Sequence, residues 1–137
     1  MRACADRLLG GRGEERAVIV LGDLNDVPLA ATTQILLGPP GSEIGTAGFA
    51  RPDRGDSWRL WNLAPLIPAE RRFTRVFEGR REMIDHVLTS RFLVTRATEV
   101  DTAGGPPPPS IGSDPRARRD APASYHALVL ARFDLGD

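Results

Sequence analysis

Three short apolar segments, each with polar residues at one end, constrain the fold of this chain more than any other feature. They cover residues 17–21, 83–89 and 127–133, and they are rich in Val, Ile and Leu. Runs of this length bounded by charged or turn-forming residues predict β-strands rather than helices. Apolar residues occupy both faces of these segments, so we expect a sheet that is covered on both sides.

Two helices are predicted between the strands. Residues 2–10 have the leucines and alanines of a short helix, which Gly10 and Gly11 end. Asp26 is placed to cap a second helix over residues 28–37. This order of helices and strands predicts a single domain of the α/β (α+β) class over residues 1–137.

The second half of the chain adds further strands and one irregular segment. Residues 73–77 and 83–89, joined by a turn at 78–80, predict a hairpin, and residues 94–100 predict another strand. Residues 101–122 are rich in proline and charge, which predicts an extended or mobile loop within the domain.

Composition excludes several classes of protein. The formal net charge is zero, with 18 basic residues that are all arginine, so no global basic field indicates nucleic-acid binding. Cys4 is the single cysteine, which excludes an internal disulfide and a cysteine-based zinc site. The sequence has no apolar run long enough for a membrane span. The first residues lack the apolar core of a signal peptide, which indicates a cytoplasmic protein if Met1 is the true start and leaves secretion open otherwise.

Polar groups at the strand ends are the candidates for chemistry. Asp23 and Asn25 follow the first strand, Asp85 lies within the second, and His126 directly precedes the last. A carboxylate can accept a proton from water, and an amide can donate to a phosphate oxygen. Each group also has a structural interpretation: a capping turn for the first, a salt bridge to an arginine for Asp85, and a structural histidine for His126.

Taken together and in this order, the motifs GDLND, IDHVLTS and SYHALVLARF resemble the C-terminal half of the endonuclease/exonuclease/phosphatase superfamily, which includes deoxyribonuclease I. The resemblance implies half of a two-sheet, four-layer α/β sandwich, and therefore a partial domain. It also implies water attack on a phosphodiester or phosphomonoester, assisted by Mg²⁺ or Mn²⁺. A phosphoester, possibly within a nucleic acid, is the implied substrate.

The resemblance also implies a role for each matching position. Asp23 is expected to orient or deprotonate the attacking water, and as a weaker expectation to bind the metal. Asn25 is expected to steady the phosphate. His126 is expected to donate to the phosphoryl oxygen, and Asp85 to fix the histidine tautomer.

Two departures from the family pattern predict impaired activity. Tyr125 stands where the family has an aspartate, and a neutral phenol does not replace a carboxylate at a metal. Segments that match the family's N-terminal half are absent from this sequence. We therefore expect weak or absent divalent-metal binding in this chain. We also expect self-association or a partner chain that supplies the other half, because aliphatic strands would lack a cover.

The alternative hypothesis to a hydrolase is a non-catalytic remnant that binds a partner or nucleic acid. In that case Arg80 and Arg81, beside the predicted hairpin, are candidates for contacting phosphates.

Overall fold

The computed structural model describes residues 1–103 and 124–136. Its helices and strands are α1 (Arg2–Leu9), β1 (Ile19–Asp23), α2 (Ala31–Leu37), β2 (Trp61–Asn62), the 3₁₀ helices η1 (Ala64–Leu66) and η2 (Ala69–Arg71), β3 (Arg75–Phe77), β4 (Arg80–Glu82), β5 (Asp85–Thr89), α3 (Arg91–Val94), β6 (Ala97–Ala103) and β7 (Leu128–Phe133). Every strand pairing among the described residues is antiparallel.

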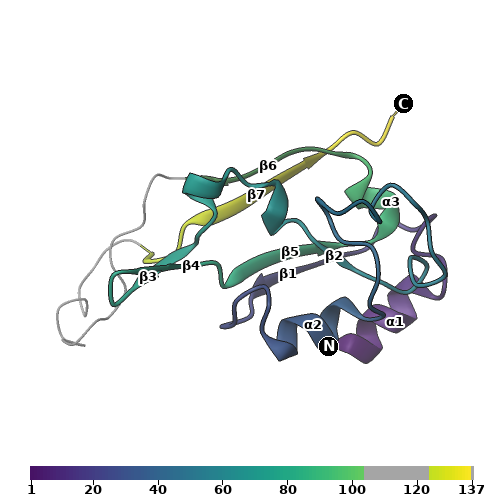
Figure 1. Ribbon diagram of the computed structural model, residues 1–137, viewed down its shortest axis with the longest axis horizontal. Helices are drawn as coiled ribbons and strands as arrows, with labels where there is room; N and C mark the ends of the chain where they lie inside the picture. Colours follow the sequence, from purple (N-terminus) through teal and green to yellow (C-terminus); the bar gives the residue numbers. More distant parts are fainter. Residues whose placement is uncertain (104–123, 137) are drawn as a thin grey trace.

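The strands form three small sheets. A three-stranded sheet has the order β1-β5-β2, and β3-β4 and β6-β7 are two-stranded ribbons. In Figure 1 the β6-β7 ribbon lies above the three-stranded sheet, and α1 and α2 lie below it. The chain therefore has the mixed α+β class that the sequence predicted, with both long helices on one side of the sheet.

Strand β5 lies between two hydrophobic clusters. Leu88 packs with Leu9, Leu36 and other residues from α1, α2 and β1. Its neighbour Val87 belongs to the second cluster, which includes Val100 of β6 and contacts side chains of β7. Successive side chains of a strand point to opposite faces, so this apolar strand is covered on both sides, as predicted.

The predicted hairpin is wrong in its second strand. The hairpin partner of β3 is β4, and β5 pairs instead with β1 and β2. A two-residue turn at Glu78 and Gly79, both with positive φ, closes the hairpin tightly. After Glu82 the Thr74 hydroxyl accepts from the backbone N–H groups of Ile84 and Asp85, so the chain leaves the ribbon before β5 begins.

Other boundaries also differ from the prediction. The first strand is shifted by two residues, to Ile19–Asp23, and places Asp23 inside the strand. Helix α2 begins at Ala31, and the Asp26 carboxylate accepts from the Thr32 hydroxyl without capping the helix.

The predicted strand over 94–100 also differs, because α3 takes Val94 and β6 runs over Ala97–Ala103. The first three residues of the predicted loop 101–122 thus belong to β6, and residues 104–122 lie outside the described part of the chain.

A buried ion pair was not predicted. The Arg59 side chain is 4% exposed, and its Nη1 lies 2.9 Å from Oδ1 of the fully buried Asp56. The same guanidinium donates to the carbonyl oxygens of Pro39 and Pro40 and so fixes the loop before β2. In the described residues, no helix has the length and apolar character needed to cross a bilayer.

Candidate active site

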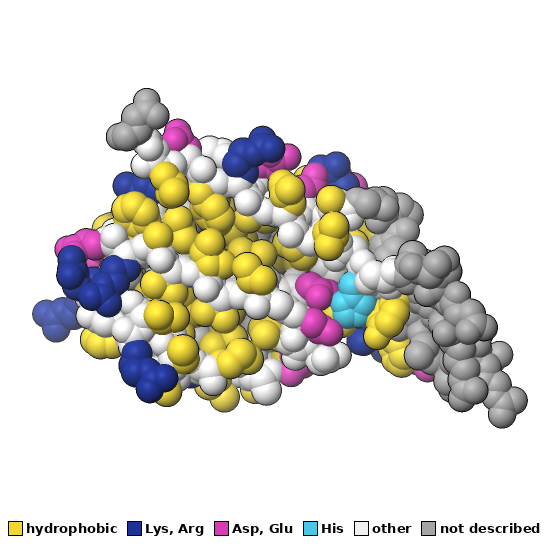
Figure 2. All heavy atoms as spheres, turned by 180° about the vertical axis from the view of Figure 1, so that it is seen from behind, with side chains coloured by type: hydrophobic (Ala, Val, Ile, Leu, Met, Phe, Trp, Pro, Cys, Tyr) yellow, Lys and Arg dark blue, Asp and Glu magenta, His cyan; other side chains and the backbone are white. Residues whose placement is uncertain are grey.

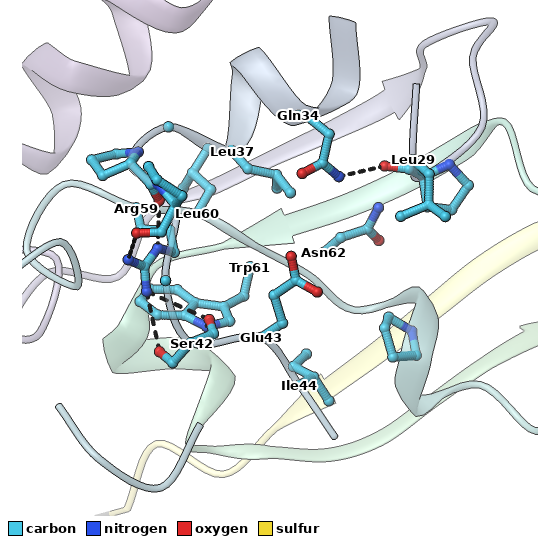
Figure 3. Close-up of a pocket in the computed structure, with 16 residues that line it drawn as sticks. Leu29, Gln34, Leu37, Ser42, Glu43, Ile44, Arg59, Leu60, Trp61 and Asn62 are labelled. Atoms are coloured by element: carbon cyan, nitrogen blue, oxygen red, sulfur yellow. Dashed lines mark hydrogen bonds between the residues drawn. The ribbon is translucent and has the colours of Figure 1, made fainter. Parts of the chain in front are cut away.

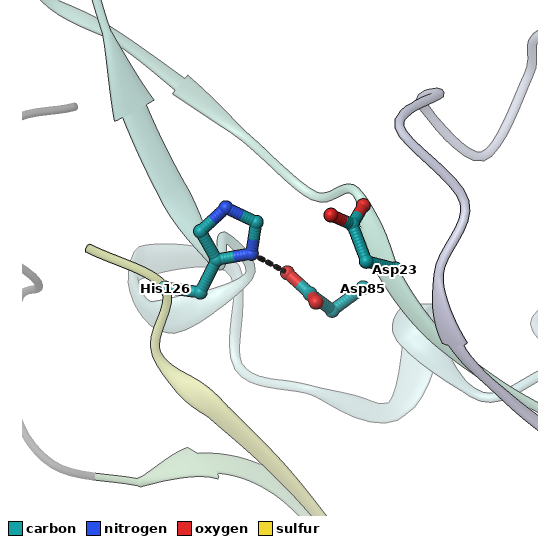
Figure 4. Close-up of side chains that lie close together, drawn as sticks. All are labelled: Asp23, Asp85 and His126. Carbon is teal, nitrogen blue, oxygen red and sulfur yellow. Dashed lines mark hydrogen bonds and ion pairs between the residues drawn. The ribbon is translucent and has the colours of Figure 1, made fainter. Parts of the chain in front are cut away.

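Three of the four predicted catalytic side chains lie together. Asp23 is the last residue of β1, Asp85 is the first residue of β5, and His126 lies two residues before β7. One potential ligand atom from each side chain lies within 4.8 Å of the others. Figure 4 shows the three side chains converging from β1, β5 and the segment before β7. Antiparallel pairing explains half of this arrangement, because it places Asp23 directly opposite Asp85.

The Asp85–His126 contact is a hydrogen bond of 2.8 Å between Nδ1 of the imidazole and Oδ2 of the carboxylate. The two side chains are 21% and 17% exposed, so water competes little with this bond. An ionised carboxylate only accepts, and therefore Nδ1 carries the proton and Nε2 remains available. The distance is that of an ordinary hydrogen bond, as expected if Asp85 fixes the histidine tautomer.

Asn25 joins the site through its backbone. Its N–H donates to Oδ1 of Asp23 at 2.8 Å, and its φ of 53° gives the left-handed conformation that asparagine tolerates. Among the contacts of the described residues, none connects the Asn25 side-chain amide to Asp85 or His126. This turn fixes the Asp23 carboxylate at the end of β1.

Tyr125 packs against the histidine. Its ring lies edge-on to the imidazole of His126, with ring centroids 4.6 Å apart and an interplanar angle of 75°. The side chain is 39% exposed. An aromatic edge contact of this kind restricts the orientation of the imidazole.

The two candidate phosphate-binding arginines are exposed on β4. Arg81 donates to the carbonyl of Glu70 at 3.2 Å and stacks over the Phe73 ring at 4.6 Å. No contact in the described part of the chain brings Arg80 or Arg81 to the Asp85–His126 pair.

The sequence interpretation missed the role of His86. This side chain is 1% exposed; its Nδ1 lies 3.0 Å from Nδ2 of Asn62, and its Nε2 lies 2.8 Å from the carbonyl of Asp26. The Asn62 amide oxygen accepts from Ala64, so Nδ2 is the donor to Nδ1 and His86 donates from Nε2. The neutral ring thereby ties the loop after Asp23 to the sheet. Its position beside Asp85 was the signal in the sequence.

The residues present fit a hydrated divalent cation. Asp23 and the second oxygen of Asp85 are hard donors, which suit Mg²⁺ or Mn²⁺, and Mg²⁺ in proteins commonly keeps several waters and uses one or two carboxylates. The hydrogen bond to Asp85 engages Nδ1 of His126. Two carboxylates therefore remain as direct donors while that bond is intact.

A separate pocket of about 250 Å³ lies between α2, the loop that follows it, and β2. Figure 3 shows Leu29, Leu37 and Ile44 around it, with the Glu43 carboxylate and the Asn62 amide among them. Neither Asp residue of the cluster nor His126 lines this pocket. Within the described part of the chain, the Asn62–His86 hydrogen bond links one residue of its lining to the loop after Asp23.

The family model of the Endonuclease/Exonuclease/phosphatase family matches residues 2–126. No curated protein and no solved structure matches the chain. The match covers most of the sequence and includes all three clustered side chains, so the chain belongs to the Endonuclease/Exonuclease/phosphatase family.

Proposed function

We propose that this protein is a metal-dependent phosphoester hydrolase, in which water attacks a phosphodiester or phosphomonoester at the Asp23–Asp85–His126 cluster. The observation that carries the proposal is the 2.8 Å hydrogen bond between Asp85 and His126 beside a second carboxylate. Family membership supports the reaction class. The finer fold proposal, a deoxyribonuclease I-like sandwich, rests on the packing of β6-β7 against one side of the β1-β5-β2 sheet.

Each side chain has a proposed role that follows from its contacts. Asp85 accepts from Nδ1–H and holds the imidazole, so that Nε2 of His126 faces the phosphoryl oxygen and donates to it in the protonated state. Asp23, exposed at the strand end, orients the water or accepts its proton. The Asn25 amide is the proposed donor to a second phosphate oxygen.

A bound Mg²⁺ or Mn²⁺ would neutralise charge on the phosphoryl group. Asp23 and Asp85 are the residues that would hold it. Tyr125 stands where the family has an aspartate, and among the described residues two carboxylates are available as direct donors. We therefore propose that the affinity is weak and the activity low, because losing one preorganised electrostatic group typically lowers a rate by about 10² to 10³.

Hydrolysis assays on the whole chain test the proposal. A phosphodiester and a phosphomonoester of p-nitrophenol, and a DNA oligonucleotide, are each incubated with MnCl₂ or MgCl₂. DNA is included because the exposed Arg80 and Arg81 are proposed to contact phosphates of a polymeric substrate. We expect slow, metal-dependent release of product from at least one of them.

Variants test whether the Asp23–Asp85–His126 cluster carries out the hydrolysis. Asp85→Asn and His126→Gln should each lower the rate by about 10² or more, since both remove a proton-transfer or charge-stabilising group. Asp134→Asn, at an exposed residue after β7, is the matched control and should keep the rate. No hydrolysis of any substrate, or equal loss in the control, contradicts the proposed function.

A further inference from the structure

Thr74 is the residue at which separate parts of the candidate site meet. It lies directly before β3 and its side chain is 0% exposed. It contacts neither the carboxylates of Asp23 and Asp85 nor the His126 ring among the described hydrogen bonds. Its contacts are instead with the backbone that carries these side chains.

The Thr74 hydroxyl holds the start of β5. Its Oγ1 accepts from the backbone N–H groups of Ile84, at 3.1 Å, and Asp85, at 3.2 Å. On the other side of the same segment, the Ile84 carbonyl accepts from the N–H of Leu24 at 2.9 Å. The backbone of Asp85 is therefore fixed between Thr74 and the residue that follows Asp23.

The main chain of Thr74 also fixes the segment that carries His126. Its carbonyl oxygen accepts from the N–H of Ala127, the residue after His126, at 2.8 Å. Its own N–H donates to the carbonyl of Glu82 at 2.9 Å, which anchors Thr74 in the β3-β4 ribbon. One buried residue thus fixes the backbone beside both Asp85 and His126, although these lie 41 positions apart.

We propose that Thr74 is a positioning residue that sets the Asp85–His126 geometry. This inference rests on the proposed function for the catalytic role of the pair. The way in which Thr74 holds the pair does not depend on that function. Valine matches the shape of threonine but accepts no hydrogen bond, so it would leave two backbone N–H groups without their acceptor. The segment must then shift toward other acceptors, and a displacement of about 1 Å is enough to misalign a catalytic pair.

The first experiment measures the pair directly by NMR of the His126 ring nitrogens, assigned with His126→Gln because the chain has 2 histidines. Thr74→Val should move the His126 ring signals and the Asp85 amide signal, and Thr74→Ser should restore them. Thr89→Val is the matched control, because Thr89 is equally buried on β5 and its hydroxyl has no partner in the described structure. Unchanged His126 signals in Thr74→Val, or equal changes in the control, overturn the proposal.

Hydrolysis gives the second readout. In Thr74→Val we expect kcat to fall by about 10- to 100-fold, as for other residues that orient a catalytic group, while Thr74→Ser stays near the original rate. If the unaltered chain shows no hydrolysis, the proposed function fails and the NMR result alone decides the role of Thr74.

Hydrogen exchange covers the case in which Thr74→Val does not fold. In the unaltered protein, the Ile84, Asp85 and Ala127 amides should exchange slowly, because each donates to a Thr74 oxygen. Fast exchange at Ile84 and Asp85 overturns the proposal without any variant.

Discussion

Asp23 and Asp85 lie directly opposite each other on the antiparallel strands β1 and β5. Like charges in such a pair destabilise a sheet by roughly 0.2–1 kcal/mol. His126 stabilises the Asp85 carboxylate by donating a hydrogen bond to it, and the Asp23 carboxylate has no cationic partner among the described residues. The pair thus keeps a local excess of negative charge, which favours a bound cation.

Asp23→Asn should stabilise the metal-free protein by roughly 0.2–1 kcal/mol, because it removes this repulsion and keeps the oxygen that accepts from Asn25. Thermal unfolding without metal measures the effect. Added MnCl₂ should raise the Tm of the original chain more than that of the variant. Asp134→Asn serves as the control, and a lower stability for Asp23→Asn than for this control contradicts the expectation.

Tyr125→Asp should tighten Mn²⁺ binding by about tenfold or more, since it adds a third carboxylate beside Asp23 and Asp85. Calorimetry of the metal-free chain with MnCl₂ measures the affinity. Tyr125→Phe keeps the ring against His126 and separates the gain of a carboxylate from the loss of the phenol. Equal affinities for the two variants would show that position 125 does not face the metal. Tight stoichiometric binding by the original chain would contradict the weak site proposed above.

Arg59→Met should lower the free energy of unfolding by about 3–5 kcal/mol, because it leaves the buried Asp56 carboxylate without its close cationic partner. Urea unfolding measures the loss. Arg132→Met is the control: this arginine is 70% exposed and pairs with Glu99 at the surface, where such a pair contributes less than about 1 kcal/mol. Similar losses in both variants would mean that the buried network does not stabilise the loop before β2.

We expect the chain to self-associate through its open strand edges. Leu21 on β1 and Leu128 on β7 are 70% and 73% exposed, and within the described residues each of these strands has a single partner strand. Figure 2 shows hydrophobic side chains spread over the face beside the acidic and histidine side chains. Unpaired edges and apolar patches of this kind favour association.

Sedimentation at low micromolar concentration measures this association. Leu21→Lys should shift the protein toward the monomer, because a charge on an edge strand opposes pairing. Leu29→Lys makes the same change at an 83% exposed loop residue and should have no such effect. A sharp monomer boundary for the original chain would show that its exposed strands do not associate.

The mixed α+β class, the family and the three clustered side chains could be predicted from the sequence. Short apolar runs predicted the strands because burial on both faces demands Val, Ile and Leu whatever their partners are. Asp23 and His126 flank these runs and Asp85 lies within one, where a carboxylate is costly unless it has a specific partner.

The strand partners and the supporting contacts could not be predicted from the sequence. The order β1-β5-β2 and the separate β3-β4 ribbon depend on where the backbone finds its hydrogen bonds, and many pairings are compatible with one apolar pattern. In the sequence, Thr74 and His86 look like ordinary strand residues. In the fold, their polar atoms bond to backbone groups of distant segments. A hydrogen bond requires two groups within about 3 Å, and the linear sequence does not encode that distance directly.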